Sequence, residues 1–97
     1  MAWSLNGPSI LKLGAQGQSW GGSSIGLPIM VSQIWYTGNT AAGGHALIRS
    51  GTANIVWDVY NAAAKDYNDV VFSPPRRFTN LILATLSNGG AVYVEKA

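Results

Sequence analysis

The chain has 97 residues, only 10% of them charged, and a formal net charge of +2 at pH 7. This length supports one domain, and the six Lys and Arg residues do not form the cluster typical of a nucleic-acid-binding face. The chain has no cysteine, which excludes a disulfide and leaves no Cys/His spacing for a structural zinc. Its stability must therefore come from apolar packing, which a subunit interface can extend.

The scarcity of charge bears on the surface of the molecule. Ordinary soluble domains have about 25% charged residues, whereas this chain combines 10% charge with 47% hydrophobic residues and 12 glycines. Two explanations stay open: a surface of Ser, Thr and Asn, or a surface partly covered in an assembly. The sequence shows no signal-peptide pattern and no apolar run of transmembrane length, so we expect synthesis in a cytoplasm and no membrane partner.

The first part of the chain, residues 1–28, differs from the rest because it is rich in glycine and contains two prolines. Short strands are predicted at residues 9–13 and 16–20, and the composition of residues 21–26 predicts a loop. We interpret residues 1–28 as an N-terminal arm or edge. Residues 29–97 then form a β-sandwich body, and the two parts make a single domain.

From residue 29 onward the strand pattern is clearer. Residues 29–37 are rich in β-branched and aromatic side chains, and their imperfect alternation predicts that both faces are partly covered. After a polar, glycine-rich loop at residues 38–44, strands at residues 45–49 and 53–60 form a predicted hairpin. Their link, Ser50-Gly51-Thr52, places glycine at the position that needs a positive φ.

The strand at residues 53–60 has the alternation of a half-buried strand. One side is apolar and is predicted to face the core, and the other side is mostly polar. The inward set is Ala53, Ile55, Trp57 and Val59, and the outward set is Asn54, Asp58 and Tyr60.

The last third of the chain predicts three more strands. Residues 61–65 have helical character but are too few for a stable helix, so we expect one helical turn or a loop. A strand at residues 68–72 is followed by Ser73-Pro74-Pro75-Arg76-Arg77, which should form an extended connector because proline lacks a donor. Strands at residues 78–86 and 91–95 then flank Asn88-Gly89, a hairpin signal.

Together these patterns predict an all-β fold of about seven or eight short strands. The spacing of strands and turns is typical of an antiparallel β-sandwich or a flattened, jelly-roll-like barrel. The glycine-rich N-terminal arm would extend from this body.

The sequence contains no recognisable reaction centre. His45 is the only histidine, and no spacing supplies it with a nucleophile and an orienting acid, so it is interpreted as a polar residue at a strand start. Asp66 and Asp69, with Asn68, can reach one Ca²⁺, although ordinary turn capping explains the same residues. We therefore predict a protein without catalytic residues, resident metal or cofactor, and leave open whether Asp66 and Asp69 bind a cation.

Aromatic and basic residues are the candidates for partner binding. Trp35 and Tyr36 are adjacent, so one should lie in the core and the other outside, where it can stack on a sugar or anchor an interface. Large aromatics in the arm should be buried against the body or a neighbour. The arginine doublet can dock on an acidic partner surface, or it can be a solvated loop. The predicted partner-binding residues are Trp3, Trp20, Tyr36, Arg76 and Arg77.

Four segments carry a resemblance to a known class of proteins. They are residues 34–43 (IWYTGNTAAG), Ile55-Val56-Trp57, Phe72-Ser73-Pro74-Pro75 and residues 88–94 (NGGAVYV). In this order they resemble small structural proteins of tailed bacteriophages, over residues 29–95. The resemblance implies a non-enzymatic virion protein, such as a capsid decoration (cement) protein, and carries over no catalytic residues.

The resemblance also implies partners and a location. The chain would be a homo-oligomer bound to the phage major capsid protein or to another virion protein. It would be made in the host cytoplasm and reside in the virion. A second hypothesis is a carbohydrate- or receptor-binding β-sandwich module of a phage tail or head fibre, in which exposed Trp and Tyr stack on sugars.

Overall fold

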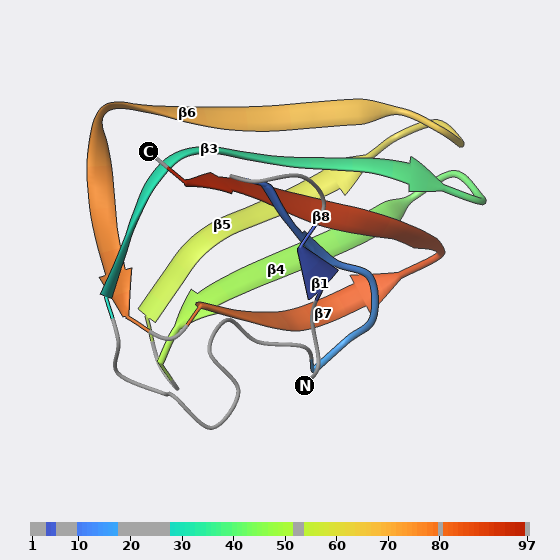
Figure 1. Ribbon diagram of the computed structural model, residues 1–97. Coiled ribbons are helices and arrows are strands. Elements are labelled where there is room, and N and C mark those ends of the chain that lie inside the picture. Colours follow the sequence, from blue (N-terminus) through green and yellow to red (C-terminus); the bar gives the residue numbers. More distant parts are fainter. Residues whose placement is uncertain (1–3, 6–9, 18–27, 52–53, 80, 97) are drawn as a thin grey trace.

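The computed structural model describes residues 4–5, 10–17, 28–51, 54–79 and 81–96. All regular structure in these residues is β, in eight strands that form two antiparallel sheets (Figure 1). No helix among them is long and apolar enough to cross a membrane. The prediction of an antiparallel β-sandwich is thus confirmed.

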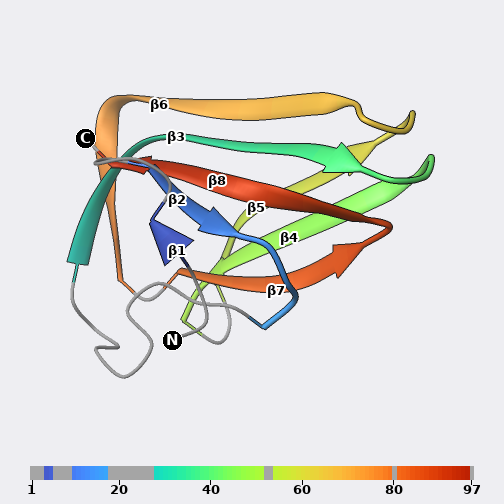
Figure 2. The ribbon, with the colours of Figure 1, turned by 45° about the vertical axis from the view of Figure 1, so that its right-hand side comes forward.

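The two sheets contain five and three strands. The larger sheet has the order β1 (Ser4–Leu5), β2 (Ile10–Leu13), β8 (Gly89–Lys96), β3 (Pro28–Asn39) and β6 (Tyr67–Thr79). The smaller sheet has the order β5 (Asn54–Asn61), β4 (Gly44–Ser50) and β7 (Leu81–Ser87). Figures 1 and 2 both show β3 between β6 and β8, and β4 between β5 and β7. The order β2-β8-β3-β6 facing β5-β4-β7 is that of a jelly roll in which no described strand takes the eighth position, beside β7.

The core lies between the two sheets and includes part of the predicted arm. Leu11 and Leu13 of β2 are each 2% exposed and belong to the same cluster as residues of β3, β4, β7 and β8. The segment at residues 10–13 is therefore an integral strand, and removing it would open the core. The predicted strand at residues 16–20 is wrong at its start, since Gln16 and Gly17 lie in a turn, and residues 18–20 lie outside the described residues.

The long strand β3 shows the two-sided covering that its sequence predicts. It lies between β6 and β8, and the register shifts between Val31 and Gln33 against both neighbours. Val31, Ile34 and Tyr36 are fully buried on the core side. The outward residues Gln33, Trp35 and Thr37 are half-buried because both neighbouring strands flank them.

The β4–β5 hairpin is confirmed, with φ of 73° at Gly51. A bulge changes its inward face, since Ile48 lies opposite Trp57 while Arg49 lies opposite Ile55. The extra residue, Val56, reverses the alternation. Ile55 is therefore 62% exposed, and the prediction that it faces the core is wrong.

The predicted hairpin around Asn88-Gly89 is wrong, because β7 pairs with β4 and β8 pairs with β2 and β3. Asn88, Gly89 and Gly90 all have positive φ, of 64°, 73° and 87°. Here three consecutive positive φ values carry the chain from one sheet to the other at a corner. The predicted strand at residues 78–86 is also divided between the two sheets, since β6 ends at Thr79 and β7 begins at Leu81.

Strand β6 continues through the two prolines, where a connector was predicted. Val71 lies opposite Gln33 and Arg76 opposite Val31, so residues 72–75 together face only Ser32. The two prolines are tolerated because β6 is an edge strand and because residues 72–75 have no partner in the ladder, so neither missing N–H interrupts it. Figure 1 shows that β6 turns sharply partway along its length. The loop at residues 62–66, in contrast, has no helix, as one of the two alternatives predicted.

Replacing Gly44 by alanine should test how closely the start of β4 packs against β3 of the other sheet. A Cβ at this buried position would lie 2.5 Å from the Tyr36 hydroxyl and 2.7 Å from Asn39 Cβ. We expect Gly44→Ala to lower the free energy of unfolding by about 2 kcal/mol or more. Gly14→Ala is the control, since its Cβ would meet only the Lys12 side chain at 3.6 Å. Equal midpoints of urea-induced unfolding for Gly44→Ala and Gly14→Ala would contradict the close packing at Gly44.

Candidate binding face on the five-stranded sheet

The outer face of the five-stranded sheet presents a row of four side chains from four strands. In the register, Lys12 of β2 lies opposite Tyr93 of β8, Tyr93 lies opposite Trp35 of β3, and Trp35 lies opposite Asp69 of β6. Residues directly opposite each other in antiparallel strands project from the same face. Two aromatic rings therefore occupy the centre of the row, with a cation at one end and an anion at the other.

The two central rings are packed against each other. The centroids of Trp35 and Tyr93 lie 5.5 Å apart with an angle of 11° between the rings, and both side chains are partly exposed. Tyr36 is 0% exposed. The expectation that one member of the Trp35-Tyr36 pair is buried is confirmed. The prediction of Tyr36 as a partner-binding residue is wrong, because Tyr36 points into the core and Trp35 points outward.

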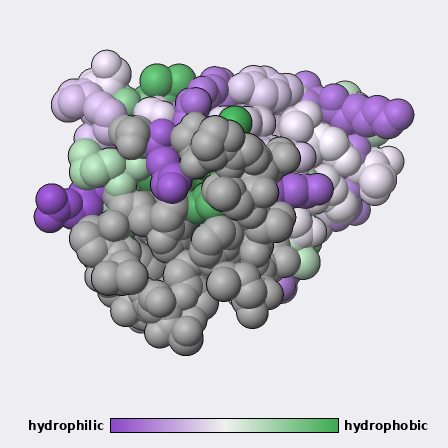
Figure 3. Space-filling model, viewed as in Figure 1, coloured by the Kyte–Doolittle hydropathy of each residue, from purple (hydrophilic) through white to green (hydrophobic). Residues whose placement is uncertain are grey.

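Other apolar side chains extend this face. Met30, Tyr67 and Val71 are 42%, 50% and 62% exposed. Tyr67 and Val71 lie opposite the outward residues Thr37 and Gln33, and Met30 lies on the side of β3 opposite to buried Val31. We call Met30, Trp35, Tyr67, Val71 and Tyr93 the aromatic face. In the space-filling view, hydrophobic and hydrophilic groups interleave along the upper edge of the molecule, where β6 runs (Figure 3).

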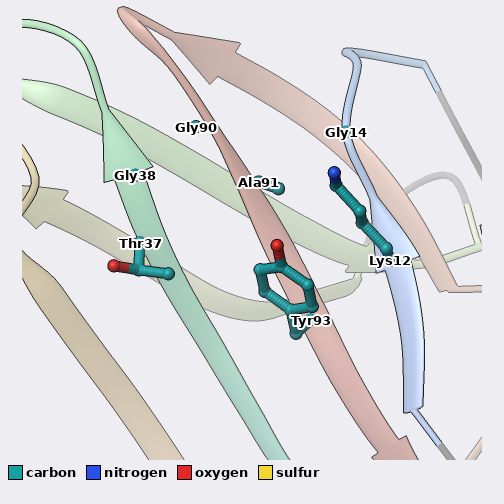
Figure 4. Close-up of a pocket in the computed structure, with 7 residues that line it drawn as sticks. All are labelled: Lys12, Gly14, Thr37, Gly38, Gly90, Ala91 and Tyr93. Atoms are coloured by element: carbon teal, nitrogen blue, oxygen red, sulfur yellow. The ribbon is translucent and has the colours of Figure 1, made fainter. Parts of the chain in front are cut away.

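A shallow hollow of about 320 Å³ adjoins the aromatic face. Figure 4 shows the Lys12 and Tyr93 side chains side by side, next to the bare backbone of Gly38 and Gly90. The hollow exists because its floor is made of small residues, and its wall is polar or aromatic. Its lining residues are Lys12, Gly14, Thr37, Gly38, Gly90, Ala91 and Tyr93. Lys12 has no ion pair with any described residue, so its ammonium is available to a ligand.

The polar side chains beside Trp35 form hydrogen bonds with one another. Gln33 Nε2 donates to Asp69 Oδ2 at 2.7 Å and to the Tyr67 hydroxyl oxygen at 3.4 Å. The pKa of Tyr67 is raised above its ordinary value, mainly by desolvation and then by the negative charge of Asp69, while the hydrogen bond from Gln33 lowers it. Tyr67 therefore stays a neutral phenol well beyond neutral pH.

A network of buried amides fixes the loops at one end of this face. Asn39 and Asn61 are both 0% exposed, and Asn61 Nδ2 donates to Asn39 Oδ1 at 3.0 Å. Asn39 Nδ2 donates to the carbonyl oxygens of Ala41 and Ala63, and Asn68 Nδ2 donates to Asn61 Oδ1 at 2.6 Å. No role was predicted for Asn39 or Asn61 from the sequence. The available signal was an asparagine immediately before a predicted loop, at Asn39 and at Asn61.

The remaining predicted partner residues lie elsewhere. Arg76 lies opposite buried Val31 and Arg77 opposite exposed Met30, so the two arginines project from opposite sides of β6. The two guanidinium groups therefore do not act as a pair on one surface. Trp3 and Trp20 lie outside the described residues.

The residues considered for catalysis or cation binding, His45, Asp66 and Asp69, also lie among the described residues. His45 Nε2 lies 2.5 Å from Asp58 Oδ1, and its ring stacks on Tyr60 at 4.0 Å, on the outer side of the smaller sheet. No described hydroxyl group hydrogen-bonds to His45. Asp66 Oδ1 accepts from the Tyr67 backbone N–H, whereas Asp69 binds Gln33. Within the described ranges, no three His, Asp or Glu side chains form a group that could hold a metal.

The Asp69–Tyr67 pair makes a pH-dependent prediction. Removing the charge in Asp69→Asn should lower the pKa of the Tyr67 phenol toward about 10, because phenolate no longer forms beside a carboxylate. The Tyr67 ring signals in an NMR pH titration report this change. Asp58→Asn, on the other sheet, is the control and should leave the Tyr67 titration unchanged. An identical Tyr67 titration in wild type and Asp69→Asn would refute the coupling.

Comparison with known proteins adds no relative to this picture. No protein-family model, curated protein or solved structure matches the chain. The function is therefore argued from the fold and from the side chains that the two sheets expose.

Proposed function

We propose that this chain is a non-enzymatic structural protein of a bacteriophage virion, a capsid decoration (cement) protein that docks through its aromatic face. The observation that carries the proposal is the concentration of exposed apolar side chains on one face. Of the five large hydrophobic side chains most exposed among the described residues, Met30, Tyr67 and Val71 share that face. Single exposed hydrophobic residues are common on monomers, but a shared patch marks an interaction site.

The energetics favour a covered face. Burial of apolar surface contributes about 25 cal/mol per Å², and the rings of Trp35 and Tyr93 are already packed together, so ordering them on binding costs little entropy. The low charge of the chain supports the same conclusion, because few ionised groups need to be desolvated. The charges in the central row, Lys12 and Asp69, lie at its two ends, where they can set the orientation of a partner.

The partner in this proposal is the phage major capsid protein or another virion protein, together with further copies of the chain. Docking by the face is favoured over pairing at the β6 edge, because Pro74 and Pro75 lie in that edge and the register is broken there. The jelly-roll order is compatible with this role, since viral capsid and lectin domains both use the fold. Fold alone does not select between those roles.

The direct test uses virions produced by the genome that encodes the chain. We expect mass spectrometry and cryo-electron microscopy to find the protein in many copies at symmetry-equivalent positions. Particles made without the gene should bind added protein saturably in a co-sedimentation experiment. Absence of the protein from purified virions, together with no binding to the gene-deleted particles, would overturn the proposal.

A charged side chain on the aromatic face should block docking. We expect Val71→Arg to weaken co-sedimentation with gene-deleted particles at least tenfold, because the arginine would have to be buried against an apolar partner surface. Tyr60→Arg is the matched control, since Tyr60 is 63% exposed and Val71 is 62% exposed, but Tyr60 lies on the smaller sheet. Thermal unfolding of both variants checks that the fold is retained. Equal loss of binding in both would remove the aromatic face as the docking site.

A specific observation favours glycan binding as a second candidate function. The Trp35–Tyr93 stack lies beside the 320 Å³ hollow, where the Lys12 ammonium offers a polar contact. Ligand sites commonly combine an apolar platform with a few polar groups in this way. In this alternative the chain is a carbohydrate- or receptor-binding module of a phage tail or head fibre.

A glycan array separates the two functions. If the second candidate holds, wild-type protein binds a defined group of glycans, and Trp35→Ala lowers that affinity about tenfold or more because the stacking surface is lost. Tyr60→Ala serves as the control on the other sheet, and circular dichroism checks the folding of each variant. Absence of binding to every glycan would exclude this candidate and leave the assembly proposal intact.

A further inference from the structure

A second hollow, of about 260 Å³, opens where the β4–β5 turn meets the second half of β6. Figure 1 shows this part of β6 at the end of the sandwich opposite the corner between β7 and β8. The lining residues are Ser50, Asn54, Ile55, Val56, Arg76, Arg77 and Phe78. We propose that this hollow binds a side-chain carboxylate of a protein segment in which an apolar residue adjoins the acidic one.

The first support is the way in which Arg76 is held. Its Cζ lies 5.6 Å from the ring centroid of Phe72 and 5.3 Å from that of Phe78, and the two rings meet edge to face at 5.4 Å. Cation–π contact with two rings limits the motion of the guanidinium group. Its N–H edges remain available, since Arg76 is exposed and makes no ion pair with a described residue. A planar, preorganised fork of donors matches a carboxylate.

The second support is that no described carboxylate forms an ion pair with Arg76 at this hollow. Each described carboxylate binds another group: Asp58 binds His45, Asp69 binds Gln33, Glu95 binds Ser32, and Asp66 accepts from a backbone N–H. No ion pair to Arg76 or Arg77 is formed within the described ranges. The Arg76 guanidinium, which has no ion-pair partner among the described residues, makes the potential at the hollow positive and favours an anionic ligand.

The third support is an exposed apolar wall. The bulge in the β4–β5 hairpin leaves Ile55 62% exposed at the hollow, which half-buried Val56 and buried Phe78 also line. An apolar side chain of the ligand can cover Ile55 while its acidic neighbour meets Arg76. A nucleic acid is a poorer match, because phosphate backbones are bound by many basic groups and this chain has a net charge of +2.

The experiment uses the whole chain and two blocked dipeptides, acetyl-Leu-Glu-amide and acetyl-Leu-Gln-amide. NMR titration should shift the Ile55 methyl and Arg76 Nε–H signals with the glutamate peptide, whose affinity should exceed that of the glutamine peptide at least tenfold. Arg76→Gln should lower the affinity for the glutamate peptide at least tenfold, and Arg76→Lys should lower it less. Lys65→Gln, which removes the same charge from an exposed loop residue, should leave it unchanged.

Three outcomes would overturn the inference. The first is equal binding of the glutamate and glutamine peptides, and the second is peptide-induced shifts at Trp35 and Tyr93 in place of Ile55 and Arg76. The third is inorganic phosphate binding as tightly as the glutamate peptide, which would show a site for any anion. Thermal unfolding of the Arg76 variants separates loss of the site from loss of the fold. No virion component enters these titrations, so their failure is distinguishable from failure of the proposed function.

Discussion

The buried amides of Asn39 and Asn61 are the contact on which the arrangement of the two sheets depends. Both strand-to-strand links that leave these residues cross from one sheet to the other, and neither side chain is exposed to water. An unpaired amide at such a depth would cost several kcal/mol, so the pairs with Ala41, Ala63, Asp66 and each other are required. Satisfying them all selects one conformation of the two loops.

Tyr36 connects this network to the third crossing at the same end. Its hydroxyl lies 3.2 Å from the carbonyl oxygens of Ser87 and Gly89, on the corner between β7 and β8, so its one proton is shared between these two acceptors. Burial raises the pKa of this phenol, so it remains a donor at ordinary pH. Gly90 is also required here, because a Cβ would lie 2.8 Å from the backbone of Asn39 and of Thr37. Three loops from distant parts of the chain thus form one rigid end.

This rigid end determines what the outer face of the larger sheet displays. Tyr36 is directed inward by its hydrogen bonds, so its neighbour Trp35 must point outward and stack on Tyr93. Gly38 and Gly90, adjacent to the loops, leave the floor of the hollow open beside Lys12. The second hollow, lined by Arg76, lies farther along β6, beyond the irregular segment at residues 72–75.

The sequence alone predicted the all-β class, the strands at residues 29–37, 45–49 and 53–60, and the opposite orientations of Trp35 and Tyr36. These features depend on period-two alternation and on local turn chemistry, which neighbouring residues encode. Only the tertiary structure decided which of the two aromatics is buried, that Asn88-Gly89 is a corner between sheets, and that a bulge exposes Ile55. It also placed Lys12 opposite Tyr93, and Arg76 and Ile55 around one hollow. Those outcomes depend on register and on hydrogen bonds between residues far apart in the chain, which no local pattern contains.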